Sequence, residues 1–191
     1  MEKRLFAISH IVYEIDTMVT ATLRHREIED AGGDWIERNI NLESALLHAR
    51  ALIEFLVRKS GRDDYMFPSD FGSGWDTSQC REVASQLGAL NAHLAHLTWT
   101  RLDKDAPRVS RTLIYDVLTD CGAFASYLKK NGRLGWQAIE EAIAEAKRLA
   151  ESRGGLCSGT IHPPFTTADT RVSVVGGRRP LELDLDISLT P

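Results

Sequence analysis

The sequence predicts a mainly α-helical protein, an antiparallel bundle of about five helices with a C-terminal β-hairpin or extended tail. Three observations carry this prediction. Apolar residues recur at spacings of three and four up to about residue 152, breaks that contain Gly or Pro separate the segments, and apolar–polar alternation begins only in the last 36 residues. We therefore expect residues 1–155 to form one helical bundle and residues 156–191 to form an extended C-terminal tail.

The first helix is expected over residues 2–25 and ends before the Ala-Gly-Gly-Asp segment at 31–34. A second helix is expected over residues 42–59, with Asn41 as its N-cap. Leu47 and Phe55 lie off its main face, which predicts contacts on more than one side. The apolar stripe of the first helix is Leu5, Ile8, Ile11, Val12, Ile15, Met18, Val19 and Leu23, and the main face of the second is Leu42, Leu46, Ala49, Ile53 and Leu56.

Residues 60–76 read as a loop rich in Gly, Asp and Ser. This loop also holds several large apolar side chains, which we expect to pack onto the bundle. They are Tyr65, Met66, Phe67, Phe71 and Trp75. A third helical stretch is expected over residues 78–101, with a break near Gly88.

A fourth helix is expected over residues 110–130, ending at Asn131-Gly132, and a fifth over residues 134–152. In the tail, residues 181–189 alternate strictly between apolar and polar, and residues 171–175 precede a Gly-Gly pair. This pattern predicts a β-hairpin. An isolated hairpin is marginal in water, so it should lie either on the bundle or on a second copy of the chain.

Composition limits the classes of function. The net charge is −4 and the pI about 5.9, a balance that argues against binding to the phosphate backbone of a long nucleic acid. Cys80, Cys121 and Cys157 are widely spaced and form no C-x-x-C motif, which favours a reducing compartment without disulfides. With no signal-peptide pattern and no run of about 20 apolar residues, the chain is expected to be cytoplasmic and not to span a membrane. No cofactor is expected.

The segment LNAHLAHLTWTR, residues 90–101, carries the first candidate site. At 100° per residue, Arg101 falls on the apolar face of Leu90, Leu94 and Leu97, where a guanidinium needs a carboxylate, a carbonyl or an anionic ligand. His93, His96 and Thr100 form an adjoining stripe. The helix dipole also favours a cation at this end, so a purely structural role for Arg101 stays open.

The first two helices carry a second set of polar groups. His48, Arg50 and Glu54 lie on the second helix and His10 and Glu14 on the first, each a candidate for binding or for a hydrogen bond at the edge of the core. His93 and His96 with His48 could supply three metal ligands, but Glu-x-x-His and H-E-x-x-H are absent, so no metal is expected. The sequence contains no P-loop, dinucleotide-binding glycine motif or nucleophile elbow.

Three short runs resemble a family of uncharacterised bacterial helical proteins: HARALIEFL at 48–56, FPSDF at 67–71 and HLTWTR at 96–101. The overall plan of that family is similar to HEPN-type domains, over roughly residues 5–130 of this chain. The resemblance implies a four- or five-helix bundle that dimerises. Active HEPN proteins are metal-independent ribonucleases, often of toxin–antitoxin or phage-defence systems.

The HEPN catalytic pattern places an Arg four to six residues before a His. By that pattern His96 would match the His, but Asn91 stands where the Arg belongs, and Arg101 follows His96 instead. The resemblance therefore implies a non-catalytic interaction or regulatory module, with a homodimer and a protein partner expected. The alternative is a ribonuclease or RNA-binding effector, in which His96 moves a proton at the ribose 2′-hydroxyl and Arg101 stabilises the phosphorane.

Overall fold

The computed structural model describes residues 2–59, 65–94 and 112–153, and these residues form helices and their connections without a β-strand. The mainly α-helical prediction is confirmed. The long helices are α1 (Glu2–Asp30), α2 (Trp35–Val57), α5 (Leu113–Lys130) and α6 (Trp136–Ser152). The shorter elements are η1 (Pro68–Asp70), η2 (Thr77–Cys80), α3 (Arg81–Ser85) and α4 (Leu87–Leu94). The predicted C-terminal hairpin lies outside the described residues.

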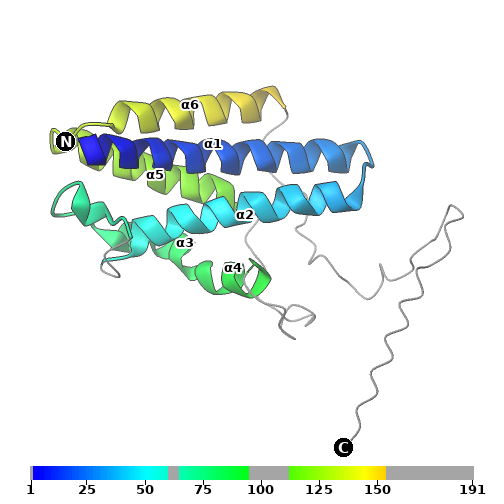
Figure 1. Ribbon diagram of the computed structural model, residues 1–191, viewed down its shortest axis with the longest axis horizontal. Coiled ribbons are helices and arrows are strands. Elements are labelled where there is room, and N and C mark those ends of the chain that lie inside the picture. Colours follow the sequence, from blue (N-terminus) through cyan, green and yellow to red (C-terminus); the bar gives the residue numbers. More distant parts are fainter. Residues whose placement is uncertain (1, 60–64, 95–111, 154–191) are drawn as a thin grey trace, which may run out of the picture.

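The long helices pack as a bundle in which α1 lies between α2 and α6, with α5 behind it (Figure 1). The helices α1 and α2 form an antiparallel hairpin and make the most extensive helix–helix contact. The short helices α3 and α4 lie along the other side of α2 (Figure 1). The connection between α5 and α6 lies beside the N-terminal end of α1, where Gly135 packs against Ile8.

The start of α2 differs from the prediction. The helix begins at Trp35, about two turns earlier than expected. Its N-cap is Asp34, whose Oδ1 accepts hydrogen bonds from the backbone N–H of Ile36 (2.7 Å) and Glu37 (3.1 Å). Asn41, the predicted N-cap, lies inside the helix and donates from its side chain to Glu37 O. Asp34, rather than Asn41, caps α2 because it directly follows the turn that reverses the chain.

Two helix ends are closed in the same way. At the end of α1, Gly33 N–H donates to Ile28 O (2.8 Å) and Gly32 N–H to Glu29 O (3.0 Å), with Gly32 at φ +62°. At the end of α5, Arg133 N–H donates to Leu128 O, and Gly132 has φ +61°. This is the Schellman geometry, which a left-handed glycine permits at little cost. The predicted end of α5 is confirmed, whereas α1 runs five residues beyond its predicted end at residue 25.

The apolar loop before α3 packs onto the bundle, as predicted. Phe71 lies edge-on to Phe55 and Phe124, and Trp75 Nε1–H donates to Leu56 O at 2.9 Å. These contacts fix the loop by both apolar packing and a hydrogen bond. The prediction is wrong for Tyr65 and Met66, which are exposed because they precede the segment that turns back onto the core.

Two apolar residues assigned to helix contacts are also exposed. Phe55 is buried as predicted, but Leu47 points out of the bundle because no described helix covers that side of α2. Leu5, on the predicted stripe of α1, is exposed near the N-terminal end of the helix. The expected break in the third helical stretch is confirmed: α3 ends at Ser85 and α4 begins at Leu87, just before Gly88. No helix in the described ranges is both long enough and apolar enough to cross a membrane.

Candidate functional site

The residues singled out from the sequence divide between the described and undescribed parts of the chain. Glu14, His48 and Arg50 lie on the α1–α2 hairpin, while Asn91 and His93 belong to α4. His96 and Arg101 lie outside the described residues, so their convergence with the others stays a prediction. The geometry available for a site is therefore that of the α1–α2 hairpin and of the surfaces around it.

Glu14 and His48 are brought together by the antiparallel packing of α1 and α2. His48 Nδ1–H donates to Glu14 Oε2 at 2.6 Å, and both side chains are partly buried. A hydrogen bond to a carboxylate of this length fixes the imidazole orientation and the tautomer. His10 takes no part in this pair and instead lies edge-on to the ring of Phe6, with centroids 4.7 Å apart.

Arg50 pairs with Glu54 along α2, as their spacing of four predicts. Arg50 Nε–H donates to Glu54 Oε1 at 3.0 Å, and Arg58 lies 3.0 Å from the other carboxylate oxygen. Both oxygens of Glu54 are therefore engaged by guanidinium groups of its own helix. This arrangement is an intrahelical ion-pair network, and it does not leave Arg50 as an isolated cation for a ligand.

Large apolar side chains are exposed on both helices of the α1–α2 hairpin. We call this surface the α1–α2 face. Its members and their exposed fractions are Phe6 (65%) and Tyr13 (56%) on α1, and Ile36 (52%), Ile40 (61%) and Leu47 (52%) on α2. The Tyr13 ring lies edge-on to the His48 ring at 5.8 Å between centroids. Tyr13 therefore links the exposed apolar side chains to the Glu14–His48 pair.

This surface was not predicted from the sequence, because the apolar residues of both helices were assigned to contacts within the bundle. The signal was nevertheless present. Phe6 and Tyr13 are seven residues apart, while Ile36, Ile40 and Leu47 are four and seven apart, so each set repeats on one side of its helix. An apolar repeat opposite the core-facing stripe is a pattern typical of a helix that contacts something outside its own bundle.

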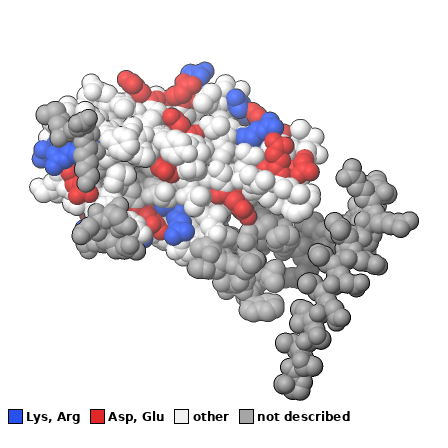
Figure 2. Space-filling view, viewed as in Figure 1, with Lys and Arg blue, Asp and Glu red and all other residues white. Residues whose placement is uncertain are grey.

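Charged groups at the margin of the α1–α2 face pair with one another. Arg24 on α1 lies 2.7 Å from Glu37 on α2, and it also approaches Glu27 on its own helix. Figure 2 shows the side of the molecule on which α1 lies in front of α5: acidic and basic groups are interleaved among uncharged side chains, without a continuous basic track. This side therefore carries charges of both signs.

Buried cysteines and an asparagine with a buried side-chain oxygen lie elsewhere in the bundle. Burial, followed by the neighbouring Asp120 carboxylate, raises the pKa of Cys80 to about 12, so this thiol stays protonated at neutral pH. Burial also raises the pKa of Cys121. In the described part of the chain, no cluster of three His, Cys, Asp or Glu side chains could hold a metal ion. Asn91 Oδ1 is buried without a hydrogen-bond partner.

Comparisons of the chain with protein-family models, with curated proteins and with solved structures find no match. The proposals below therefore depend on the contacts, burial and charge of the described residues.

Proposed function

We propose that the chain is a non-catalytic interaction module that self-associates through the α1–α2 face. The observation that carries the proposal is the set of five large apolar side chains, each more than half exposed, on two adjacent helices. Exposed apolar side chains occurring singly are ordinary on protein surfaces. A group of this size on two adjacent helices is typical of an interaction surface.

The expected free energy of association favours a reversible dimer. Completing the burial of a half-exposed Leu, Ile or Tyr side chain contributes on the order of 1 kcal/mol. With equivalent side chains from two copies, the gain is similar to or somewhat larger than the lost translational and rotational freedom. The expected product is a dimer that forms at micromolar concentration and dissociates on dilution.

The face suits a second copy because both helices of the hairpin contribute apolar side chains. A two-fold axis perpendicular to the face would place α1 of each copy beside the same surface of the other, so apolar groups meet apolar groups. The charges at the margin are satisfied internally by pairs such as Arg24–Glu37, so they do not demand an oppositely charged partner. The resemblance to HEPN-type domains, which usually dimerise, adds to this proposal.

The test is the mass of the purified chain measured by sedimentation equilibrium from about 1 to 200 μM. Wild type should shift from the mass of one 21.3-kDa chain toward that of two. Leu47→Glu and Ile40→Glu should abolish the shift. Met66→Glu, at an exposed apolar residue outside the face, should leave it unchanged. Circular dichroism and thermal unfolding establish that each variant is folded, and Leu47→Gln supplies a milder second variant.

Two results would overturn the proposal: a wild-type protein that stays monomeric throughout this range, or a dimer that Leu47→Glu and Ile40→Glu do not weaken. A dimer retained in both variants would mean that another surface mediates association.

The ribonuclease is the second candidate, favoured by the unpartnered Asn91 Oδ1 in α4, shortly before His96 in the sequence. Its test is cleavage of labelled single-stranded RNA in EDTA by wild type, His96→Ala and Arg101→Ala. Cleavage that follows the purified wild-type protein and is lost in both variants would replace the non-catalytic proposal. Equal background activity in all three proteins would reject the ribonuclease.

A further inference from the structure

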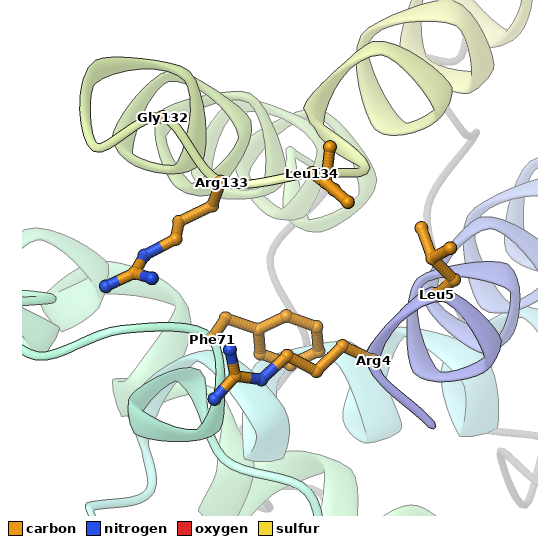
Figure 3. Close-up of a pocket in the computed structure, with 6 residues that line it drawn as sticks. All are labelled: Arg4, Leu5, Phe71, Gly132, Arg133 and Leu134. Atoms are coloured by element: carbon orange, nitrogen blue, oxygen red, sulfur yellow. The ribbon is translucent and has the colours of Figure 1, made fainter. Parts of the chain in front are cut away.

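A cavity of about 300 Å³ lies between the N-terminal end of α1, the loop after η1 and the connection from α5 to α6. Three segments that are far apart in the sequence therefore supply its walls. Figure 3 shows the side chains around it. The lining residues are Arg4, Leu5, Phe71, Gly132, Arg133 and Leu134.

The described lining of the cavity is positively charged. Arg4 and Arg133 come from opposite walls, and none of the other described lining residues is acidic. Within the described ranges, neither guanidinium forms an ion pair. Of the other described arginines, all but Arg81 have a carboxylate within 4.0 Å: Arg24, Arg26, Arg38, Arg50, Arg58, Arg148 and Arg153.

The Arg133 side chain is positioned by the fold rather than left free at the surface. Its backbone N–H closes the Schellman turn at the end of α5, which fixes the start of the side chain. Its guanidine end lies over Gly72: a Cβ at residue 72 would be 3.2 Å from Arg133 Nε and 2.8 Å from Tyr127 Oη. Tyr127 Oη–H donates to Ser73 O at 2.9 Å, which holds the ring in place.

The remaining walls are apolar. Leu5 and Leu134 project from opposite sides, and the ring of Phe71 lies near the Arg4 side chain (Figure 3). Phe71 is itself fixed by edge-on contacts with Phe55 and Phe124. The cavity therefore combines a rigid aromatic floor, aliphatic walls and two cations.

We propose that this cavity binds a small organic anion, an apolar or aromatic body that carries a phosphate or carboxylate group. Guanidinium groups present forked donors that match the oxygens of both anions. A volume of about 300 Å³ is at the lower end of the range for small-molecule sites, which excludes large ligands. The apolar body would cover Leu5, Leu134 and Phe71 while the anion lies between Arg4 and Arg133. This inference does not depend on self-association.

The experiment is titration of the full-length chain, by calorimetry or protein NMR, with four probes: phenyl phosphate, benzoate, inorganic phosphate and benzyl alcohol. Phenyl phosphate or benzoate should bind, and benzyl alcohol should not. A preference for phenyl phosphate identifies a phosphate site, and a preference for benzoate a carboxylate site. Inorganic phosphate should bind more weakly than phenyl phosphate because it leaves the apolar walls uncovered.

Variants assign the binding to this cavity. Arg4→Gln and Arg133→Gln should each weaken binding of the preferred probe roughly tenfold, because each removes charge-assisted hydrogen bonds. Arg148→Gln, at an exposed and ion-paired arginine on α6, should leave binding unchanged. Leu134→Ser should weaken binding of the aromatic anion but not of inorganic phosphate, and its exposed position makes misfolding a minor concern.

Three outcomes would overturn the proposal: none of the anions binds at 10 mM or below, Arg148→Gln weakens binding as much as Arg133→Gln, or benzyl alcohol binds as tightly as phenyl phosphate. Thermal unfolding of each variant, measured in parallel, separates lost binding from lost folding.

Discussion

His48 on α2 donates a hydrogen bond of 2.6 Å from Nδ1 to Oε2 of Glu14 on α1, across the helix pair with the most extensive contact among the described elements. The two residues are 34 positions apart in the sequence. The bond ties the centre of α1 to the centre of α2 and orients His48 edge-on to Tyr13. It therefore holds the His48 ring beside Tyr13, one member of the α1–α2 face.

We expect Glu14→Gln and His48→Gln to show a coupling energy of about 1 kcal/mol in a double-mutant cycle. Either substitution alone removes the hydrogen bond, so the double variant should lose less stability than the two single variants added together. Urea denaturation at pH 7 and a fixed protein concentration measures it. The control cycle is Glu145→Gln with Arg148→Gln, an exposed pair on α6 with an expected coupling below about 0.5 kcal/mol. Equal couplings for the two pairs would contradict a special role for Glu14–His48.

Asp34→Ala should lower the free energy of unfolding by about 1 kcal/mol, because it removes the acceptor for two N–H groups at the start of α2. Asn41→Ala should change it by less than about 0.5 kcal/mol, because alanine is the better helix former at an interior position. Chemical denaturation of both variants measures the difference. A larger loss in Asn41→Ala would place the N-cap where the sequence pattern put it.

Asp120→Asn should alter how stability depends on pH. Burial, with the nearby Asp116 and Glu82 carboxylates, raises the pKa of Asp120 above its ordinary value of 3.8, despite the hydrogen bond from the Cys80 thiol. The native state therefore binds this proton more tightly than the unfolded state, and stability falls as pH rises through the raised pKa. At pH 7 the Asn variant does not lose this stability, because its side chain does not ionise.

The stability gain of Asp120→Asn over wild type should be largest near pH 7 and should shrink as the pH is lowered toward 4. Denaturant midpoints at several pH values measure it, with Glu151→Gln at an exposed site of α6 as the control. A gain that grows on acidification would reverse the assigned sign.

Gly135→Ala should destabilise the fold by about 2 kcal/mol or more, since φ is +92° and an added Cβ would lie 2.6 Å from Ile8 Cγ1. Gly132→Ala is the matched control: φ is +61°, but no atom lies within 4 Å of its added Cβ, so only the left-handed strain of about 1 kcal/mol applies. Urea denaturation compares the two. Equal losses would mean that Ile8 moves aside at no cost.

Local patterns predicted much of the fold. The stripe of α1, the break at residues 31–34 and the end of α5 depend on spacing and on glycines within one helical turn, so they can be read from neighbouring residues. The pairing of Arg50 with Glu54 was predicted for the same reason, because residues four apart on a helix are adjacent. The start of α2 was misplaced because Asp34 and Asn41 are both acceptable N-caps by residue type.

The sequence by itself determined the mainly helical class, the order of the helices and the intrahelical pairs, since backbone hydrogen bonds and side-chain periodicity act within a few residues. Only the tertiary structure decided that Glu14 pairs with His48 rather than with His10, that Leu47 is exposed, and that Arg4 and Arg133 line one cavity. These relationships join segments separated by tens to more than a hundred residues. Helix packing determines them, and the periodicity of a single helix does not specify which helix lies beside it.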